Sequence, residues 1–178
     1  ISEYKKPSVI IQDGVNLELF YPIDTERFQK KKKNDCITIG WVGNSKWALK
    51  NGMDNKGLNT IIKPAIGILK SNGYRVEENY ADRNTGVIPL NEMVTYYSKI
   101  DLLVCASDIE GTPNPVLEAM ACGRAVIATP LGFSEYIENG KDGVIIPAKD
   151  EKALKDAIVD LMKNDKKRKM LEKNARKK

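Results

Sequence analysis

The sequence predicts an α/β fold in which helices cover both faces of a parallel sheet. Short apolar runs with the length of buried strands alternate along the chain with longer segments of helical periodicity. Such alternation is typical of parallel strands that are joined by helical crossovers and buried on both faces. With 178 residues and no internal repeat, the chain is long enough for one sizeable domain or a small pair of domains.

Hydrophobic periodicity defines the individual elements. A continuous apolar run favours a buried strand, whereas apolar residues three and four positions apart favour a helix with one buried face. The predicted strands of the main domain are residues 37–42, 74–80, 100–106, 125–128 and 144–146. The predicted helices are residues 58–70, 91–99, 115–122, 134–138, 151–163 and 165–176.

Turn and capping residues set several boundaries of these elements. In the first helix, Pro64 marks either a kink or the true start. In the third helix, Asn114 is the predicted N-cap, Pro115 suits the first helical position, and Gly123 is placed to end the helix. Asp150 is the predicted N-cap of the fifth helix.

The N-terminal residues are predicted to precede the main domain. Residues 9–12 have the character of a short strand that ends at a turn signal. Residues 16–35 are polar and include four consecutive lysines, so we interpret them as a linker. The predicted organisation is therefore an interdomain strand and linker over 1–35 and one domain over 36–178. Because the chain begins without Met, we also expect it to be a piece of a longer protein.

The composition excludes several classes of site. The chain is 42% hydrophobic and 30% charged, which is ordinary for a soluble globular protein, and no stretch approaches the ~20 apolar residues of a membrane span. It contains no histidine, which excludes a histidine base, a Ser-His-Asp triad and a histidine-ligated metal within the chain. Cys36, Cys105 and Cys122 have apolar neighbours and form no C-x-x-C motif, so we expect free buried thiols in a reducing compartment.

The positive charge is concentrated at the C-terminus. Residues 163–178 contain nine Lys/Arg and two Asp/Glu, a net charge of +7, so residues 1–162 carry −2 of the total of +5. We favour a solvated helix face supported by charge pairs four residues apart. The alternative is attraction of this segment to anionic lipid. Nucleic-acid binding fits poorly, because the rest of the chain is slightly acidic and shows no aromatic-basic platform.

The most informative stretch is residues 110–123, Glu-Gly-Thr-Pro-Asn-Pro-Val-Leu-Glu-Ala-Met-Ala-Cys-Gly. It places the carboxylates of Glu110 and Glu118 eight positions apart, across the turn from a predicted strand into the next helix. This edge of an open α/β sheet is where ligands bind, and the N–H groups of a helix start suit a phosphate. The stretch resembles the paired-glutamate segment of the retaining GT-B glycosyltransferases, especially family 4.

Three further segments resemble the same family and occur in its order. They are Asp13-Gly14-Val15-Asn16 with Phe20 and Pro22, then Lys56-Gly57-Leu58, and then Leu131-Gly132-Phe133-Ser134-Glu135 followed by Gly140 and Gly143. The resemblance implies that residues 36–178 are the Rossmann-like C-terminal half of a GT-B fold. That half binds the nucleotide-sugar donor, and the N-terminal acceptor domain is absent from the chain.

The resemblance also implies a reaction. This is metal-independent, configuration-retaining transfer of a sugar, of the hexosyl type, to a glycan or lipid-linked acceptor in polysaccharide biosynthesis. The chain has no Asp-x-Asp motif, and we discount Asp108-Ile109-Glu110 as a metal site. We therefore expect no metal or other cofactor, and a UDP-sugar is the first guess for the donor. The expected location is cytoplasmic or peripheral at the inner face of the membrane, and we expect the isolated chain to bind nucleotide without transferring sugar.

Site roles carried over from the family fall first on the paired glutamates. Glu110 is expected to accept hydrogen bonds from hydroxyls of the donor sugar, and Glu118 to bind the ribose, whose diol suits a carboxylate. Backbone N–H groups of Gly111, Thr112 and Asn114 are expected to approach the sugar and β-phosphate. Glu110 is also one of the two catalytic candidates.

The second catalytic candidate, Lys56, is the expected cation for the diphosphate, and Lys46 is the competing choice. Gly43 is expected to let the backbone approach the ligand. The family usually has an arginine after this glycine, but here Asn44 and Ser45 follow, so either Lys46 replaces the arginine or these two residues bind phosphate as neutral donors. The loop at Val87 and Ile88 matches the family's base-binding loop, which acts through backbone contacts.

Three alternatives stay open at this point. One is a non-catalytic nucleotide-sugar-binding module, which the missing arginine favours. Another is a glycogen-type or sugar-phosphate synthase of the same fold, which would differ in donor and acceptor. The third is a generic doubly wound domain with no donor site, for which replacing either glutamate would change no ligand affinity.

Overall fold

The computed structural model describes residues 14–23, 36–47, 53–130 and 137–178. Within these residues, five parallel strands form one sheet in the order β2-β1-β3-β4-β5, which confirms the predicted fold class. The strands are β1 (Ile37–Gly43), β2 (Val76–Asp82), β3 (Leu102–Cys105), β4 (Ala125–Ala128) and β5 (Val144–Ile145). The α-helices are α2 (Lys63–Ser71), α3 (Met93–Ser98), α4 (Asn114–Ala121), α5 (Glu151–Lys163) and α6 (Asp165–Lys177).

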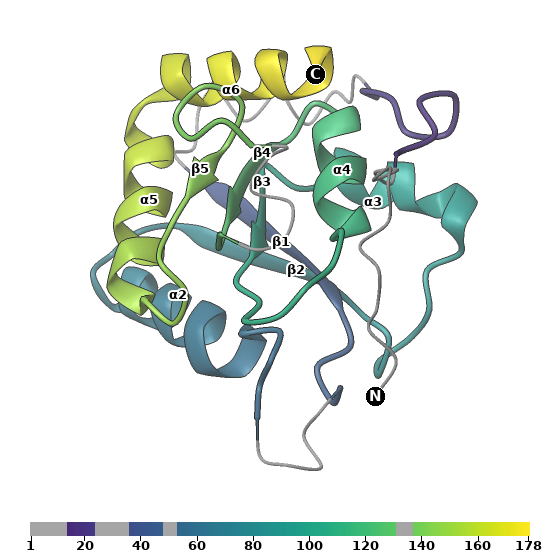
Figure 1. Ribbon diagram of the computed structural model, residues 1–178. Helices are drawn as coiled ribbons and strands as arrows, with labels where there is room; N and C mark the ends of the chain where they lie inside the picture. The colour runs from purple at the N-terminus through teal and green to yellow at the C-terminus, as the bar shows by residue number, and fades with distance from the viewer. Residues whose placement is uncertain (1–13, 24–35, 48–52, 131–136) are drawn as a thin grey trace, which may run out of the picture.

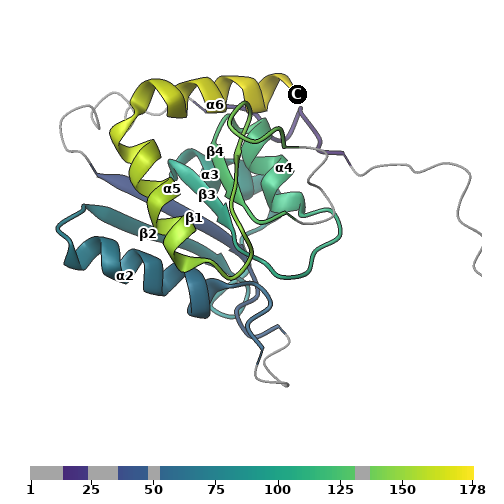
Figure 2. The ribbon, with the colours of Figure 1, turned by 60° about the vertical axis from the view of Figure 1, so that its left-hand side comes forward.

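Helices cover both faces of the sheet, as Figures 1 and 2 show. Alternate residues of each strand point to opposite faces, so the sheet has two hydrophobic layers. One face buries Ile39 and Ile127 beneath α2 and α5. The other face buries Leu103 and Val126 beneath α3 and α4. The apolar strands are therefore buried on both sides, which is why they read as continuous hydrophobic runs.

Several predicted boundaries differ from the structure. The strand predicted over 74–80 lies two residues later, at Val76–Asp82, because Ala81 and Asp82 still pair with β1. The helix predicted over 58–70 begins with a π-helical turn at Leu58–Ile62, and α2 starts at Lys63 with Pro64 in its first turn. Pro64 therefore marks the start of the α-helix, one of the two predicted outcomes.

The predicted bounds of the other elements agree with the structure in some cases and differ in others. A 3₁₀ turn at Leu90–Glu92 precedes α3 where one helix over 91–99 was predicted, and β3 is shorter than the predicted 100–106. The strand over 125–128 and the helix over 151–163 are confirmed. The Asp150 carboxylate accepts the Ala153 N–H at 2.8 Å, as predicted for an N-cap.

The start of α4 differs from its prediction in one respect. Pro113, not Asn114, is the N-cap residue, because the Pro113 carbonyl already accepts the first helical bond, from the Val116 N–H at 2.8 Å. Asn114 is therefore the first helical residue, and its side chain makes no capping bond. The predicted end is confirmed, since Gly123 and Arg124 donate to carbonyls of the last turn in a Schellman arrangement.

The basic C-terminal segment forms α6, which lies along one end of the sheet (Figure 1). Leu171 and Ala175 are buried, so the helix docks with its apolar face, while Lys166, Lys169, Lys173, Lys177 and Lys178 are exposed. Asp165 pairs with both Arg168 and Lys169, which agrees with the favoured interpretation of a charge-paired helix face. No helix in the described segments is both long and apolar enough to cross a bilayer.

Some predictions fall wholly or mostly outside the described residues. These are the strand over 9–12, most of the helix over 134–138 and the family segment at 131–135. Of the predicted linker over 16–35, only residues 16–23 are described. Phe20 in that stretch is 3% exposed and packs edge-on against Tyr97, with ring centroids 6.1 Å apart, so this part belongs to the packed domain.

Candidate functional site

The candidate site lies at the topological switch point of the sheet. The chain passes from β1 to β2 on one side and then returns to β3 on the other side of β1. The crossovers therefore diverge between β1 and β3, and ligands of doubly wound folds bind outside the carboxyl ends of such a strand pair. A pocket of about 330 Å³ opens there. Its polar and charged lining residues are Asn44, Lys56, Arg83, Ser107, Glu110, Thr112 and Asn114.

Lys56 and Glu110 meet inside this pocket. The Lys56 ammonium forms an ion pair with Glu110 Oε1, and the Ser107 hydroxyl donates to the same oxygen at 2.8 Å. The side chains are only 21% and 16% exposed, so the pair is largely shielded from water. The Lys56 ammonium also lies 5.3 Å from the ring centroid of Trp47, within range of a cation–π contact.

Backbone contacts hold the two partners in place. The Asp108 N–H donates to the Asn55 carbonyl at 2.9 Å, which joins the loop of Glu110 to the loop of Lys56. Gly57 follows Lys56 with φ of +66°, and a Cβ on it would lie 2.3 Å from the Ala106 carbonyl oxygen. Only glycine permits this approach, so the residue after Lys56 sets the close packing of the loop against the end of β3.

The end of β1 has a similar constraint. A Cβ on Gly43 would lie 2.6 Å from the Trp41 ring, and Trp41 is 2% exposed. Trp41 is therefore part of the hydrophobic core. The small residue at Gly43 makes room for this ring, while its backbone lines the pocket. Trp47 also lines the pocket and is 52% exposed.

Glu118 lies on α4 but does not line the pocket. The Tyr97 hydroxyl donates to Glu118 Oε2 at 2.6 Å. Burial raises the pKa of Glu118 above its usual value, although the Tyr97 hydrogen bond and the Arg83 charge oppose the rise. Burial and the Glu118 charge raise the pKa of Tyr97 well above its usual value, so its hydroxyl stays a hydrogen-bond donor.

Residues after β1 and β2 form one polar network. Ser45 donates to Asp82 through its N–H at 3.1 Å and through its hydroxyl at 2.5 Å. The Asn84 amide donates to Asn44 Oδ1 at 2.6 Å and to the Ser45 hydroxyl at 3.1 Å. Burial opposes the ionisation of Asp82, but hydrogen bonds from Ser45 and Asn84 outweigh it and lower its pKa. The two loops are therefore held together by an ionised carboxylate.

The structure brings together part of the predicted site. Gly43, Asn44, Lys56, Glu110, Thr112 and Asn114 line one pocket. Ser45, Lys46, Gly111, Glu118, Val87 and Ile88 are not among its lining residues. Val87 is 74% exposed, and Ile88 packs partly against the core. The roles of both groups stay predictions.

Two residues at or near the site were not predicted from the sequence. Arg83 lines the pocket at the end of β2, and Tyr97 holds Glu118. Arg83 was missed because the predicted strand ended at residue 80, which placed it inside a loop. A cation directly after a strand was the signal that could have identified it. Tyr97 carried no local signal, because its partner lies on another helix.

None of the three cysteines forms a disulfide. Cys122 is buried, whereas Cys36 and Cys105 are half-buried, so the predicted burial holds fully for Cys122 alone. Burial raises the pKa of Cys105, which lines the pocket, to about 11. This thiol is therefore protonated at neutral pH and is not a ready nucleophile.

Comparisons with known proteins agree with this architecture. A family model described as "Glycosyl transferases group 1" matches residues 71–164. An α-1,3-N-acetylgalactosaminyltransferase of Campylobacter jejuni, named for an N,N'-diacetylbacillosaminyl-diphospho-undecaprenol acceptor, is 29% identical over 96% of this chain and 49% of its own length. The chain spans about half the length of the curated relatives it matches.

Solved structures give the same result for the fold. The C-terminal domain of the group 1 glycosyl transferase LpcC from Francisella tularensis superposes with a TM-score of 0.71 and 27% identity, over 92% of this chain and 95% of that domain. Anabaena HepE, solved with UDP and glucose, has a TM-score of 0.71 over 95% of this chain and 51% of its own, and at 16% identity it supports the fold alone. The chain therefore belongs to the group 1 glycosyl transferases, and its fold is that of the C-terminal domain of these GT-B enzymes.

Proposed function

We propose that this chain binds a nucleotide-sugar donor in the pocket between β1 and β3, as the donor half of a retaining, metal-independent glycosyltransferase. The observation that carries the proposal is the Lys56–Glu110 ion pair inside a pocket at the switch point of the sheet. A donor presents a sugar rich in hydroxyls next to an anionic diphosphate. An adjacent carboxylate and ammonium match these two groups.

The proposed roles follow the chemistry of each side chain. Glu110 accepts hydrogen bonds from the sugar hydroxyls, and Lys56 neutralises charge that grows on the leaving diphosphate. Asn114 begins α4, so its N–H is one of the helix-start donors that have no partner within the helix. Thr112 lines the same pocket, so the two residues offer neutral donors to a phosphate.

The carboxylates of the pocket loop support chemistry without a metal. Asp108 and Glu110 are each already paired with a lysine, Asp108 with Lys149 at 3.2 Å and Glu110 with Lys56. A divalent cation is bound by several oxygen ligands that surround one point. We therefore assign stabilisation of the diphosphate to side-chain cations and backbone donors.

The acceptor is proposed to bind outside this chain. The Campylobacter relative is named for transfer to a diphospho-undecaprenol-linked sugar, and a lipid-linked or glycan acceptor is our proposal for the enzyme that contains this domain. On this proposal the chain alone binds nucleotide and transfers no sugar. Robust transfer by the purified chain would contradict that division of roles.

The test is a titration of UDP, GDP, CDP and ADP into the 178-residue chain, followed by NMR shifts. We expect saturable binding of one nucleotide and at least tenfold weaker binding by Glu118→Ala, the proposed ribose ligand. Asp156→Ala is the control, because this carboxylate is 60% exposed on α5, and it should bind as the wild type does. Absence of binding by every nucleotide would refute the donor site. Binding by a full-length parent that transfers no sugar would instead identify a non-catalytic module.

A further inference from the structure

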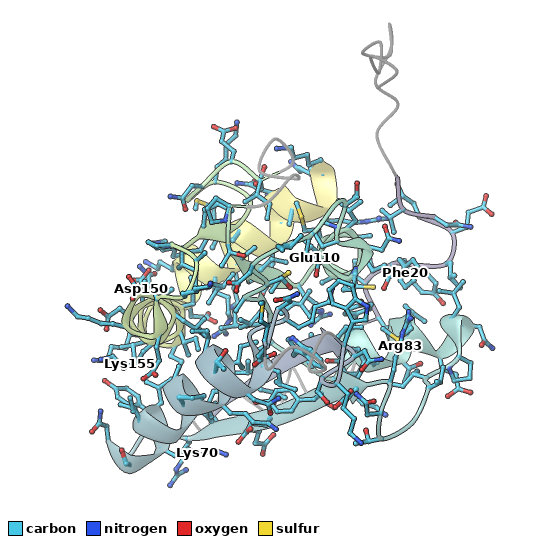
Figure 3. The ribbon with its side chains drawn as sticks, turned by 60° about the horizontal axis from the view of Figure 1, so that its bottom comes forward. Phe20, Lys70, Arg83, Glu110, Asp150 and Lys155 are labelled. Atoms are coloured by element: carbon cyan, nitrogen blue, oxygen red, sulfur yellow. The ribbon has the colours of Figure 1, made fainter. Side chains whose placement is uncertain are left out.

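We propose that Arg83 is the cation that gives this donor site its excess positive charge and that its guanidinium contacts the nucleotide diphosphate. The inference rests on the proposed function. Arg83 lies one residue beyond β2, the strand next to β1, and it lines the same pocket as Lys56 and Glu110. Figure 3 labels Arg83 and Glu110. It comes from a different loop than either of them.

The charge balance of the pocket is the first argument. Within the described part of the chain, the charged side chains that line it are Lys56, Arg83 and Glu110. The Lys56 charge is met by Glu110 in a shielded ion pair, so these two side chains together attract a diphosphate weakly. Arg83 supplies the remaining positive charge, and among the described residues its side chain has no hydrogen-bonded or ion-paired partner.

The position of Arg83 is fixed by the end of the sheet. Its N–H donates to the Gly43 carbonyl at 2.9 Å, which extends the β1–β2 ladder by one residue. The neighbouring Asp82 and Asn84 hold Ser45 and Asn44 across the same gap. Arg83 therefore projects from a backbone that is tied on both sides to the loop after β1.

The side-chain amide of Asn44 is a second candidate donor to the diphosphate. Asn44 Oδ1 accepts hydrogen bonds from the Asn84 amide at 2.6 Å and from the Lys46 N–H at 3.0 Å. Both bonds occupy the carbonyl oxygen, so the amide nitrogen of Asn44 is left to donate into the pocket that it lines. A planar guanidinium beside a neutral amide donor suits the oxygens of a diphosphate.

Arg83 also acts on the proposed ribose ligand. Its positive charge lowers the pKa of Glu118 and so opposes the effect of burial. The guanidinium therefore lies close enough to influence both the pocket and the carboxylate of α4. Arg83 is therefore the charged side chain of the pocket that also acts on the carboxylate of Glu118.

The experiment compares a nucleoside diphosphate with its nucleoside. UDP, GDP, CDP and ADP are titrated into the 178-residue chain, and the tightest binder and its nucleoside are then titrated into Arg83→Gln, Arg83→Lys and Arg75→Gln. Arg75 is the matched control, because it precedes the opposite end of the same strand, about 25 Å away along the extended backbone. NMR shifts measure weak nucleoside binding as well.

We expect Arg83→Gln to bind the diphosphate at least tenfold more weakly, which corresponds to about 1.4 kcal/mol, and the nucleoside within twofold of wild type. The diphosphate affinity of Arg83→Lys should lie between those of wild type and Arg83→Gln, because lysine keeps the charge and loses the paired N–H donors of the guanidinium. The affinity of Arg75→Gln should equal that of wild type. An unchanged diphosphate affinity in Arg83→Gln, or an equal loss for diphosphate and nucleoside, would overturn the Arg83 assignment and leave the donor site standing. A wild-type chain that binds no nucleotide would overturn both.

Discussion

Tyr97→Phe tests whether one buried hydroxyl stabilises the domain through the charge of Glu118. The substitution removes the 2.6 Å hydrogen bond to Glu118 Oε2 and keeps the aromatic ring that packs against Phe20. Replacing a fully buried tyrosine by phenylalanine leaves the half-buried carboxylate without that donor. The loss should therefore come from the hydrogen bond and not from a change in ring packing.

The expected magnitude depends on the charge of Glu118. A hydrogen bond to a charged group contributes about 1.5–3 kcal/mol, and one to a neutral group about 0.5–1.5 kcal/mol. We expect Tyr97→Phe to lower the free energy of unfolding by about 2 kcal/mol at pH 8 and by less than about 1 kcal/mol at pH 4. The pKa of Glu118 should rise further in the variant, because the Tyr97 hydrogen bond opposes the effect of burial.

The sign of the pH dependence follows from this shift. Because folding raises the pKa of Glu118, its contribution to stability is present below the unfolded value of 4.5 and is lost as the pH rises through the folded value. If the folded-state pKa of Glu118 rises further in Tyr97→Phe, the pH range between its unfolded and folded values becomes wider. The stability difference between wild type and variant should therefore grow with pH and then level off above both folded pKa values.

The assay is urea denaturation of both proteins across this pH range, with the Glu118 carboxyl followed by ¹³C NMR. Tyr80→Phe is the matched control, since it removes a 2.7 Å hydrogen bond to the more exposed Glu78, and it should cost less than about 1 kcal/mol. Equal losses at pH 4 and pH 8 for Tyr97→Phe would refute the argument. So would an undiminished loss in a Glu118→Gln background, where the charge is absent.

Two further predictions concern local backbone structure. Asp54 Oδ2 accepts the Asn59 and Thr60 N–H groups at 2.6 and 2.9 Å, so Asp54→Ala should lower the unfolding free energy by about 1 kcal/mol, as loss of a helix cap does. Urea denaturation checks this, and a change equal to that of a solvent-exposed substitution would argue against capping. Lys149 has φ of +58°, so Lys149→Gly should be more stable than Lys149→Ala by about 1 kcal/mol. Thermal melting compares the two, and equal midpoints would mean that this backbone carries no strain.

The relation between sequence and fold is clearest where local signals are strong. The strand at Ala125–Ala128 and the helix at Glu151–Lys163 lie where they were predicted, because an apolar run and an N-cap aspartate are both local properties. The end of β2 was predicted too early, because Ala81 and Asp82 belong to the sheet only through their pairing with β1. That error concealed Arg83.

The site shows the same division. The spacing of Glu110 and Glu118 identified the strand-to-helix turn, and the order of segments identified the family. The sequence could not show that Lys56 and Glu110, 54 residues apart, form an ion pair. It also could not show that Glu118 turns toward Tyr97 instead of lining the pocket.

The sequence by itself determined the fold class, the family and the candidate residues at the carboxyl edge of the sheet, because periodicity and motif spacing are recorded along the chain. Tertiary structure alone decided which charges meet, which remain for a ligand, and which glycines have no room for a side chain. These properties depend on distances between loops from different strands. Sheet order sets those distances, and no short stretch of sequence contains it.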